Sequence, residues 1–190
     1  MLFDELSFSV DSGHILEIAG ANGSGKTSLM RILCGLREAD SGAVSWMGKD
    51  IHEHDHHYRN DLAYIGYESG IKPDLTTLEN LNFSASLLSE KCPLTAEQAL
   101  AEVGLDKYAW TLCSRLSTGQ KRRIALARLL LTNARVWVLD EPLTGLDKAV
   151  KQLIGNMLVR HAAQGGVVIL TTHEPIELTN ASVQQLWLGQ

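Results

Sequence analysis

Hydrophobic positions divide the chain into a few short apolar runs and several stretches with helical spacing. Apolar runs occupy residues 14–19, 62–67, 136–139 and 167–171. The last two are continuous, which is typical of strands covered on both faces of a parallel sheet. After the glycine-rich stretch that follows the first run, apolar side chains recur with helical spacing at Leu29, Ile32, Leu33 and Leu36. The pattern predicts an α/β fold.

The middle of the chain has almost no strand pattern. Threonines stand before glutamate or glutamine there, as at helix N-termini: Thr76 and Thr77 before Glu79, and Thr95 before Glu97 and Gln98. We therefore expect one domain, residues 1–190, with a helical subdomain inserted at roughly residues 74–131. We expect residues 146–163 to form a crossover helix between the apolar runs at 136–139 and 167–171.

Residues 43–47 alternate between apolar and polar side chains after a turn, and they predict an edge strand. The polar residues 48–60 predict a loop. This loop contains the tract HEHDHH at residues 52–57, whose side chains include metal ligands. We expect a solvated loop rather than a metal site, because nothing in a polar loop fixes the ligands in place.

Composition narrows the class of protein. Hydrophobic residues make up 45% and charged residues 21%, which are ordinary values for a soluble globular domain. A net charge of −5, with one basic triplet at residues 121–123, argues against binding to nucleic acid. No apolar run is long enough to span a bilayer, and the N-terminus does not resemble a signal peptide. Cys34, Cys92 and Cys113 form no CxxC pair, so we expect a reduced cytosolic protein.

Residues 20–27 read GANGSGKT and match the phosphate-loop pattern G-x-x-x-x-G-K-[ST] between a predicted strand and a predicted helix. The glycines let backbone N–H groups surround an anion, and the helix N-terminus adds partial positive charge. We expect Lys26 to reach the terminal phosphates and Thr27 to hold Mg²⁺. An accidental glycine-rich turn is the alternative, which the flanking elements disfavour. The expected nucleotide-binding residues are Gly20, Ala21, Asn22, Gly23, Ser24, Gly25, Lys26, Thr27 and Ser28.

The apolar run at residues 136–139 ends in two acids, Asp140 and Glu141. We expect Asp140 to hold Mg²⁺ through water and Glu141 to polarise an attacking water. Solvated strand-end acids are the alternative, but the phosphate loop needs a magnesium partner and the strand is strongly apolar. No asparagine in the chain precedes a lysine, so the guanine-reading motif N-K-x-D of GTPases is absent.

A third motif, LSTGQ, occupies residues 116–120. Together with the phosphate loop, DEP at 140–142, GLD at 145–147 and the isolated His173, it makes the chain resemble an ATP-binding cassette (ABC) ATPase over nearly its whole length. The resemblance implies a P-loop NTPase core sheet of the ABC type, with an antiparallel β edge and the inserted helical subdomain. It also implies ATP and Mg²⁺ as cofactors.

The resemblance further implies that two copies, or a copy and a paired ABC subunit, bind two ATP molecules head to tail. Each site would join one copy's phosphate loop to the signature residues of the other, which are Ser117, Thr118, Gly119 and Gln120. These residues open a predicted helix and so offer a second anion-binding N-terminus, although Ser117 also fits an ordinary N-cap. By position, Glu141 is the general base, His173 the γ-phosphate switch and Asp147 the acid of the loop that meets the opposite copy, while Lys26 completes the catalytic set.

Two features depart from the ABC pattern. The family usually places a glutamine after the third strand, where it bridges Mg²⁺, water and the transporter contact, and Glu68 stands at that position. Its carboxylate keeps an oxygen but lacks the amide donor and adds a charge, so the coupling role of this position is open. The family also stacks adenine on an early aromatic residue, for which the candidates are Phe3 and Phe8, both better suited to the core. We expect the family's first strand to be absent.

Within the superfamily, residues 64–81 and 165–175 are most similar to the ATP-binding subunit of the haem exporter of bacterial cytochrome c maturation. This similarity implies a peripheral protein on the cytoplasmic face of the inner membrane, partnered by integral membrane transporter subunits. ATP hydrolysis would drive release or export of haem or of its loaded chaperone. Another ABC importer or exporter, a soluble regulatory ABC module and a non-hydrolysing nucleotide-binding scaffold are the alternatives. Leu75, Leu78 and Leu81 fit either a partner-facing surface or the core.

Overall fold

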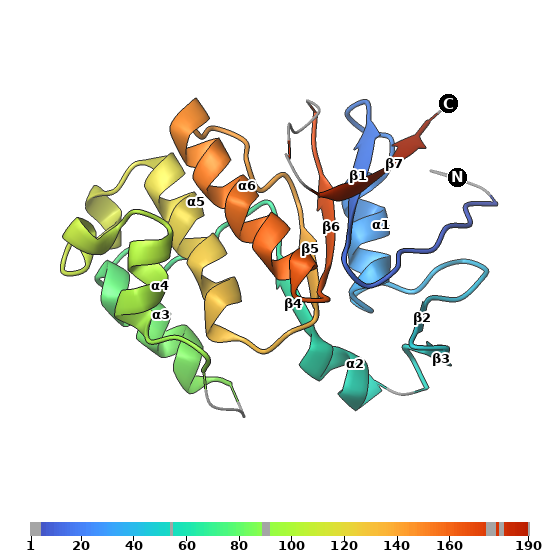
Figure 1. The fold of residues 1–190 in the computed structure, drawn as a ribbon, viewed down its shortest axis with the longest axis horizontal. Coiled ribbons are helices and arrows are strands. Elements are labelled where there is room, and N and C mark those ends of the chain that lie inside the picture. The colour runs from blue at the N-terminus through green and yellow to red at the C-terminus, as the bar shows by residue number, and fades with distance from the viewer. Residues whose placement is uncertain (1–4, 54, 89–91, 174–177, 179–180, 190) are drawn as a thin grey trace. The chain divides into compact units, whose positions relative to one another are not determined.

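The computed structural model describes residues 5–53, 55–88, 92–173, 178 and 181–189. The chain forms two compact units. The first unit comprises Met1–Tyr64, Ala134–Glu141 and Gly155–Gln190, and the second comprises Ile65–Asn133 and Pro142–Ile154. Figure 1 shows the elements of each unit.

A five-stranded sheet in the order β4-β5-β6-β1-β7 organises the first unit. Its strands are β1 (His14–Gly20), β4 (Leu62–Ile65), β5 (Val136–Leu139), β6 (Val167–Thr171) and β7 (Ser182–Leu188). Strand β1 pairs in parallel with β6 and with β7, and β5 pairs in parallel with β6. The three predicted apolar strands at 14–19, 136–139 and 167–171 are confirmed, whereas the sequence pattern did not indicate β7.

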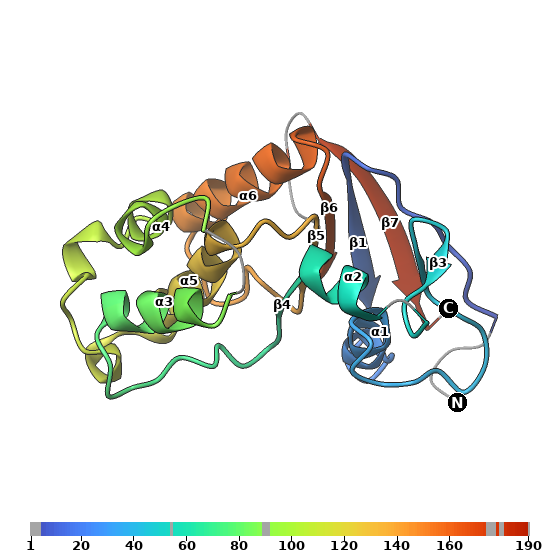
Figure 2. The same ribbon diagram turned by 90° about the horizontal axis from the view of Figure 1, so that it is seen from below.

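Helices cover both faces of this sheet. Helix α1 (Lys26–Leu33) lies beside β1 (Figure 2) and buries Leu29, Met30 and Leu33 in one core cluster with alternate residues of β1, β5 and β6. The part of helix α6 (Lys148–Ala163) that belongs to the first unit lies on the opposite face, where its His161 ring stacks on Trp137 of β5 at 3.7 Å between ring centroids. This double coverage explains why β5 and β6 are buried at every position.

The predicted edge strand at residues 43–47 is confined to residues 45–46, whereas residues 48–61 are more ordered than the sequence pattern predicts. Strand β2 (Ser45–Trp46) pairs antiparallel with β3 (Lys49–Asp50) across Met47 and Gly48, which both have positive φ as in a tight hairpin turn. Helix α2 (Asp55–Asp61) follows. The prediction of a loop over 48–60 was therefore wrong.

The physical reason lies in two apolar residues of this polar stretch. Ile51 is buried in the core cluster, and Tyr58 is buried there while its hydroxyl donates to the carbonyl of Leu33 at 2.6 Å. Both anchor the segment to the core of the first unit. The side chains of His52, His56 and His57 are exposed, and His54 lies outside the described residues.

Helices make up the second unit, where α3 (Thr77–Ser86), α4 (Ala96–Glu102) and α5 (Thr118–Ala127) lie side by side (Figure 1). Short 3-10 turns occupy Asp106–Tyr108, Cys113–Arg115 and Arg128–Leu131. Thr76 and Thr95 cap α3 and α4 in full capping boxes with Glu79 and Gln98, as predicted. Leu78 and Leu81 are buried and Leu75 is half-buried, so the first two leucines belong to the core.

The predicted strand at 62–67 ends early, at Ile65. Its first three residues are half-buried, and Ile65 is buried. The carbonyls of Gly66 and Tyr67 accept hydrogen bonds from Arg122 instead of from a neighbouring strand. Within the described part of the chain, no helix combines the length and hydrophobicity that crossing a membrane requires.

Candidate functional site

The phosphate loop, residues 20–27, connects β1 to α1 in the way the motif predicts. Gly25 at the helix N-cap has φ of +97°, a left-handed conformation that glycine adopts without strain, and no side chain caps the helix. The first turn of α1 contains no acidic residue. The N-terminus of α1 is therefore suited to an anion, because its first N–H groups and its dipole carry partial positive charge.

Close packing around the loop requires glycine at its first position. A Cβ at Gly20 would lie 2.7 Å from the carbonyl oxygen of Leu188 and 2.7 Å from Oγ of Ser24. The end of β7 therefore lies directly against the phosphate loop. The hydroxyl of Ser24 is buried and has no hydrogen-bond partner among the residues that the structure describes. Buried hydroxyl groups normally make a hydrogen bond. The Ser24 hydroxyl is therefore suited to donate a hydrogen bond to a phosphate bound in the loop.

Lys26 lies back along its own loop. Its Nζ donates to the carbonyl of Gly20 at 2.7 Å and to that of Ala21 at 3.0 Å, and only 7% of the residue is exposed. An ammonium has three donors, so one proton can still point away from these carbonyls. The loop thus fixes the position of a buried positive charge beside the N-terminus of α1.

Asp140 stands at the end of β5 and is 2% exposed. One carboxylate oxygen, Oδ2, accepts from the hydroxyl of Thr27 at 2.9 Å. The other, Oδ1, accepts from the hydroxyl of Thr171 at 2.7 Å. The structure therefore brings the two predicted magnesium ligands, Thr27 and Asp140, into direct contact, and Thr171 of β6 orients the carboxylate from the other side.

These oxygens suit Mg²⁺. The ion prefers oxygen ligands and is usually held in proteins by one or two side chains, together with substrate phosphates and water. Among the described residues, no group of three or more His, Cys, Asp or Glu side chains is arranged to hold a metal. A pair made of one hydroxyl and one carboxylate next to a phosphate loop fits an ion that arrives with a nucleotide.

Glu141 has an unusual backbone conformation for a residue other than glycine, with φ of +50°. Its N–H donates to the hydroxyl of Thr171 at 2.8 Å, and its Oε1 contacts Nε2 of His173. Its side chain is 15% exposed, against 40% for that of His173. Asp140 and Glu141 therefore face different partners, although they are adjacent in sequence.

The C-terminal end of α1 is buried in the core of the first unit. Burial raises the pKa of Cys34 to about 12, and the charge of Asp140 acts in the same direction. Burial also raises the pKa of Tyr58, whose hydroxyl donates to Leu33. Cys34 is thus an inert apolar group rather than a nucleophile.

The signature residues and Asp147 belong to the second unit. The hydroxyl of Ser117 accepts from the N–H of Gln120 at 3.2 Å, and Gln120 Oε1 accepts from the N–H of Ser117 at 2.8 Å. Ser117 and Thr118 are exposed, and the first turn of α5 contains no acid. A Cβ at Gly119 would lie 3.3 Å from the carbonyl oxygen of Gly145, so α5 approaches the segment that leads to Asp147 closely.

Asp147 and Glu68 differ in their local roles. The Oδ1 atom of Asp147 accepts from the N–H of Val150 at 2.9 Å and thereby caps the start of α6. The side chain of Glu68 is exposed. Of the two candidates for the adenine contact, Phe8 packs in part against the core cluster, as expected, and Phe3 lies outside the described residues.

Sequence reasoning missed three side chains that orient the backbone or the side chains of predicted site residues. Thr171 holds both Asp140 and Glu141, and its signal was a hydroxyl residue inside an otherwise apolar run. Arg122 and Arg128 donate to the carbonyls of residues 66–70, on both sides of Glu68. Their signal was only a basic cluster after LSTGQ, because partners some 55–59 positions away in sequence leave no local pattern.

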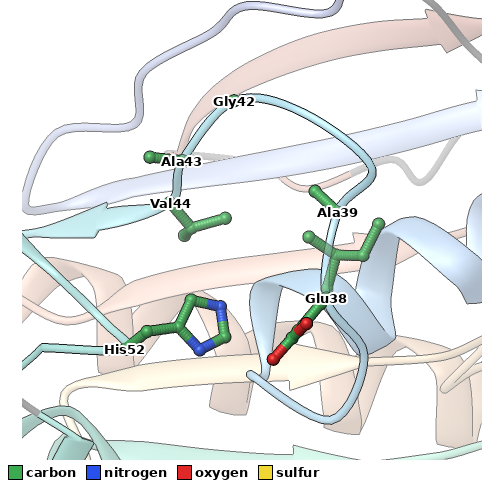
Figure 3. A pocket seen from close by; sticks show the side chains of 7 residues that line it. Glu38, Ala39, Gly42, Ala43, Val44 and His52 are labelled. Carbon is green, nitrogen blue, oxygen red and sulfur yellow. The ribbon is translucent and has the colours of Figure 1, made fainter.

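A small hollow lies elsewhere in the first unit, between the end of α1 and β2. It is lined by Ile32, Glu38, Ala39, Gly42, Ala43, Val44 and His52. Figure 3 shows the carboxylate of Glu38 and the imidazole of His52 beside this space. Both residues are exposed, so the hollow lacks the buried convergent polar groups that are typical of ligand sites.

Comparison with known proteins shows the family of the chain. The ABC transporter family profile matches residues 3–144. The "Cytochrome c biogenesis ATP-binding export protein CcmA" of Yersinia pestis is 46% identical over 188 residues, covering 99% of this chain and 86% of the relative. The proteins of the same name from Nitrosomonas europaea and Escherichia coli K12 are 45% and 41% identical, covering 99% and 100% of this chain and 89% and 90% of the relatives.

Solved structures show the same fold. A "Putative ABC transporter (ATP-binding protein)" from Pyrococcus furiosus superposes with a TM-score of 0.81 at 25% identity, covering 96% of this chain and 88% of the other. The "Structure of ATP binding subunit of ABC transporter" gives a TM-score of 0.82 at 26% identity, covering 98% and 79%. The chain belongs to the ABC transporter family, among the cytochrome c biogenesis ATP-binding export proteins.

Proposed function

We propose that this chain is the ATP-hydrolysing subunit of an export complex for cytochrome c biogenesis. The hydrogen-bonded set of Thr27, Asp140, Thr171 and Glu141 at the phosphate loop is the observation that carries this proposal. The relatives are named as ATP-binding export proteins of cytochrome c biogenesis. ATP hydrolysis would drive release or export of haem or of its loaded chaperone.

The phosphate loop binds the triphosphate. Its N–H groups, Lys26 and the N-terminus of α1 offset the negative charge, and the buried hydroxyl of Ser24 supplies a further hydrogen bond. Thr27 and Asp140 hold Mg²⁺, which neutralises charge that develops on the phosphates during hydrolysis. Thr171 keeps the Asp140 carboxylate oriented toward Thr27, since it occupies the other oxygen.

Glu141 is the general base. Thr171 fixes its backbone, and the contact with His173 orients its carboxylate, so the glutamate can accept a proton from an attacking water. His173 is exposed enough to reach the γ-phosphate as well. It therefore serves both to position the base and to sense the phosphate.

A second copy, or a paired ABC subunit, completes each site. Ser117 and Thr118 stand exposed at the start of α5, whose N-terminus lacks acidic side chains and so favours an anion. The Ser117 hydroxyl, now used in the capping box, is available to a phosphate as a donor while it accepts from Gln120. Asp147 lies in the loop that meets the opposite copy.

Membrane subunits are the remaining partners in this proposal, with the chain bound at the cytoplasmic face of the inner membrane. The relatives are named as export proteins, and export requires a path across a membrane. The described part of this chain contains no helix able to provide that path. An integral membrane partner supplies it.

Mixing two inactive variants tests the shared site. Lys26→Ala disables the phosphate loop and Ser117→Arg disables the signature, so each variant alone should lose ATPase activity. A mixed dimer pairs the intact phosphate loop of one copy with the intact signature of the other. Equal mixing should then restore about a quarter of the wild-type rate if the two sites turn over independently.

The control mixture combines Lys26→Ala with Glu141→Gln, two changes that fall in the same half of each site. No dimer in that mixture has an intact site, so no activity should return. If ATPase activity returns in neither mixture, although the variants are folded and dimeric, Ser117 does not act across the dimer. Absence of ATPase activity in the wild-type chain, alone and with its membrane subunits, would contradict the proposed function itself.

A further inference from the structure

The basic cluster after the signature residues has no role in the function proposed so far. The cluster consists of Lys121, Arg122 and Arg123, which follow Gln120 on α5, and of Arg128, which follows the end of that helix. The net charge of the chain is −5, which argues against a role for this basic cluster in binding nucleic acid. Two of these arginines instead point to the backbone of a distant segment.

Arg122 lies on α5 and is 6% exposed. Its Nη1 donates to the carbonyl of Gly66 at 2.7 Å and to that of Tyr67 at 3.1 Å. Gly66 and Tyr67 are the first residues after β4. A buried guanidinium therefore takes over the carbonyls that a longer strand would have offered to a neighbouring strand.

Arg128 begins the 3-10 turn at the end of α5. Its Nη1 donates to the carbonyl of Ser69 at 3.0 Å, and its Nη2 donates to that of Gly70 at 2.9 Å. Arg128 is half-buried, and burial lowers the pKa of its guanidinium. The two arginines thus hold four of the five carbonyls in residues 66–70, and the residue between the two pairs is Glu68.

We propose that Arg122 and Arg128 are positioning residues that fix residues 66–70 to α5, so that Glu68 and Tyr67 move together with Ser117. This inference rests on the proposed function, in which Ser117 binds a phosphate in the partner's site. Ser117 begins the same helix that carries Arg122. A displacement of α5 when the dimer closes on ATP is therefore passed directly to the segment that contains Glu68.

The exposed side chains of residues 66–70 can transmit this movement to a partner protein. Tyr67 is 68% exposed and Glu68 is exposed, while their backbone is held by the guanidinium groups beneath. Hydrogen bonds from charged donors are stronger than those from neutral donors. The backbone of residues 66–70 should therefore move together with α5. An anchored backbone with free side chains is suited to pushing on a partner protein.

Arginine-to-lysine substitutions test the inference while keeping the charge. Lysine cannot reproduce the forked contacts of a guanidinium. Arg123 provides a matched control, because its Nη1 makes the same kind of bonds from the same helix to the carbonyls of Val103 and Gly104, at 3.1 and 3.2 Å. The variants are Arg122→Lys, Arg128→Lys and the control Arg123→Lys, each assayed in the complex with the membrane subunits.

Hydrogen exchange gives a readout that does not depend on activity. In Arg122→Lys and Arg128→Lys, the amides of residues 66–70 should exchange faster than in the wild type, by about tenfold or more, whereas Arg123→Lys should accelerate residues 103–105 instead. The ATPase kcat of the complex should fall by about 10- to 100-fold in the first two variants, as expected when a positioning contact is lost, with KM for ATP within about twofold of the wild type.

A double-mutant cycle with Glu68→Ala shows whether the arginines act through this residue. If they do, Arg128→Lys should cause no further loss of kcat in the Glu68→Ala background, whereas the effect of Arg123→Lys should be independent of that background. Equal losses from all three arginine variants, or full additivity with Glu68→Ala, would overturn the inference. Those outcomes leave the wild-type ATPase activity untouched, so they are distinguishable from failure of the proposed function.

Discussion

The hydroxyl of Thr171 donates to Oδ1 of Asp140 at 2.7 Å, in the interior of the first unit. The same hydroxyl accepts from the N–H of Glu141 at 2.8 Å. Thr171 is completely buried, so water cannot replace either bond. One side chain of β6 therefore orients both acids at the end of β5, which we propose as the metal ligand and the general base.

We expect Thr171→Val to lower kcat strongly while ATP binding changes little. Valine has the same shape but removes the hydrogen bonds of the Thr171 hydroxyl to Asp140 and to the Glu141 N–H, which should lower the free energy of unfolding by about 1–3 kcal/mol. The misplaced base should reduce kcat by about 10- to 100-fold. Steady-state ATPase assays, nucleotide binding and urea unfolding measure the three quantities. Thr171→Ser keeps the hydroxyl and should restore most of the rate; an equally slow serine variant would count against the hydrogen bonds as the cause.

Glu141→Gln should trap an ATP-bound dimer. Glutamine keeps the shape and the contact with His173 but cannot accept a proton from water, so turnover should fall by at least about a hundredfold. Phosphate release measures the rate, and light scattering after chromatography with MgATP measures the dimer. Glu38→Gln, at an exposed glutamate away from the phosphate loop, should behave as the wild type. Undiminished hydrolysis in Glu141→Gln would remove this residue from the role of base.

The thiol of Cys34 should resist alkylation in the folded protein. Its pKa of about 12 leaves roughly one thiolate in ten thousand at pH 8, and the residue is buried. Cys92 is only half-buried and should react first, whereas Cys34 and Cys113 should require urea. Mass spectrometry of peptides labelled with iodoacetamide before and after unfolding checks this order. Rapid labelling of Cys34 without denaturant would mean that the core behind the phosphate loop opens readily.

Stability should depend on pH through His161. Burial lowers the pKa of this ring, which stacks on Trp137 with its Nε2 3.2 Å from the carbonyl of Arg135. Because the folded pKa lies below the unfolded value of about 6.5, the unfolded chain binds more protons as the pH falls. The stabilisation is therefore complete above that value and is lost as the pH falls from about 6.5 through the folded pKa.

Urea unfolding of the wild type and of His161→Phe at pH 7.5 and pH 5.5 measures this contribution. Phenylalanine keeps the aromatic stacking but does not titrate, so the variant should lose less stability than the wild type between the two pH values. An identical pH dependence in both proteins would show that His161 titrates normally in the folded state.

The phosphate loop illustrates how much local sequence can predict. Its glycines, Lys26 and Thr27 act within one turn between a strand and a helix, so their spacing alone indicates the geometry. The contact between Thr27 and Asp140 could also be anticipated, because parallel strands β1 and β5 end at the same edge of the sheet. Ser117 was identifiable as a helix cap for the same reason: a cap acts on the N–H three residues later.

Other features depended on the packing of distant segments. The hairpin and helix within residues 45–61 form because Ile51 and Tyr58 find a place in the core, against a local composition that favours a loop. Strand β7 was missed because an edge strand in contact with β1 has neither the continuous apolar run nor the strict alternation of a clear strand pattern.

The sequence by itself determined the chemistry of this protein: a phosphate loop, two acids after an apolar strand, a capped signature helix and the family to which they belong. The tertiary structure decided which side chains orient that chemistry, through the bonds of Thr171 to the two acids and of Arg122 and Arg128 to the backbone around Glu68. Motifs are local because backbone geometry repeats over a few residues. Orienting contacts join residues far apart in the chain, and only folding brings those together.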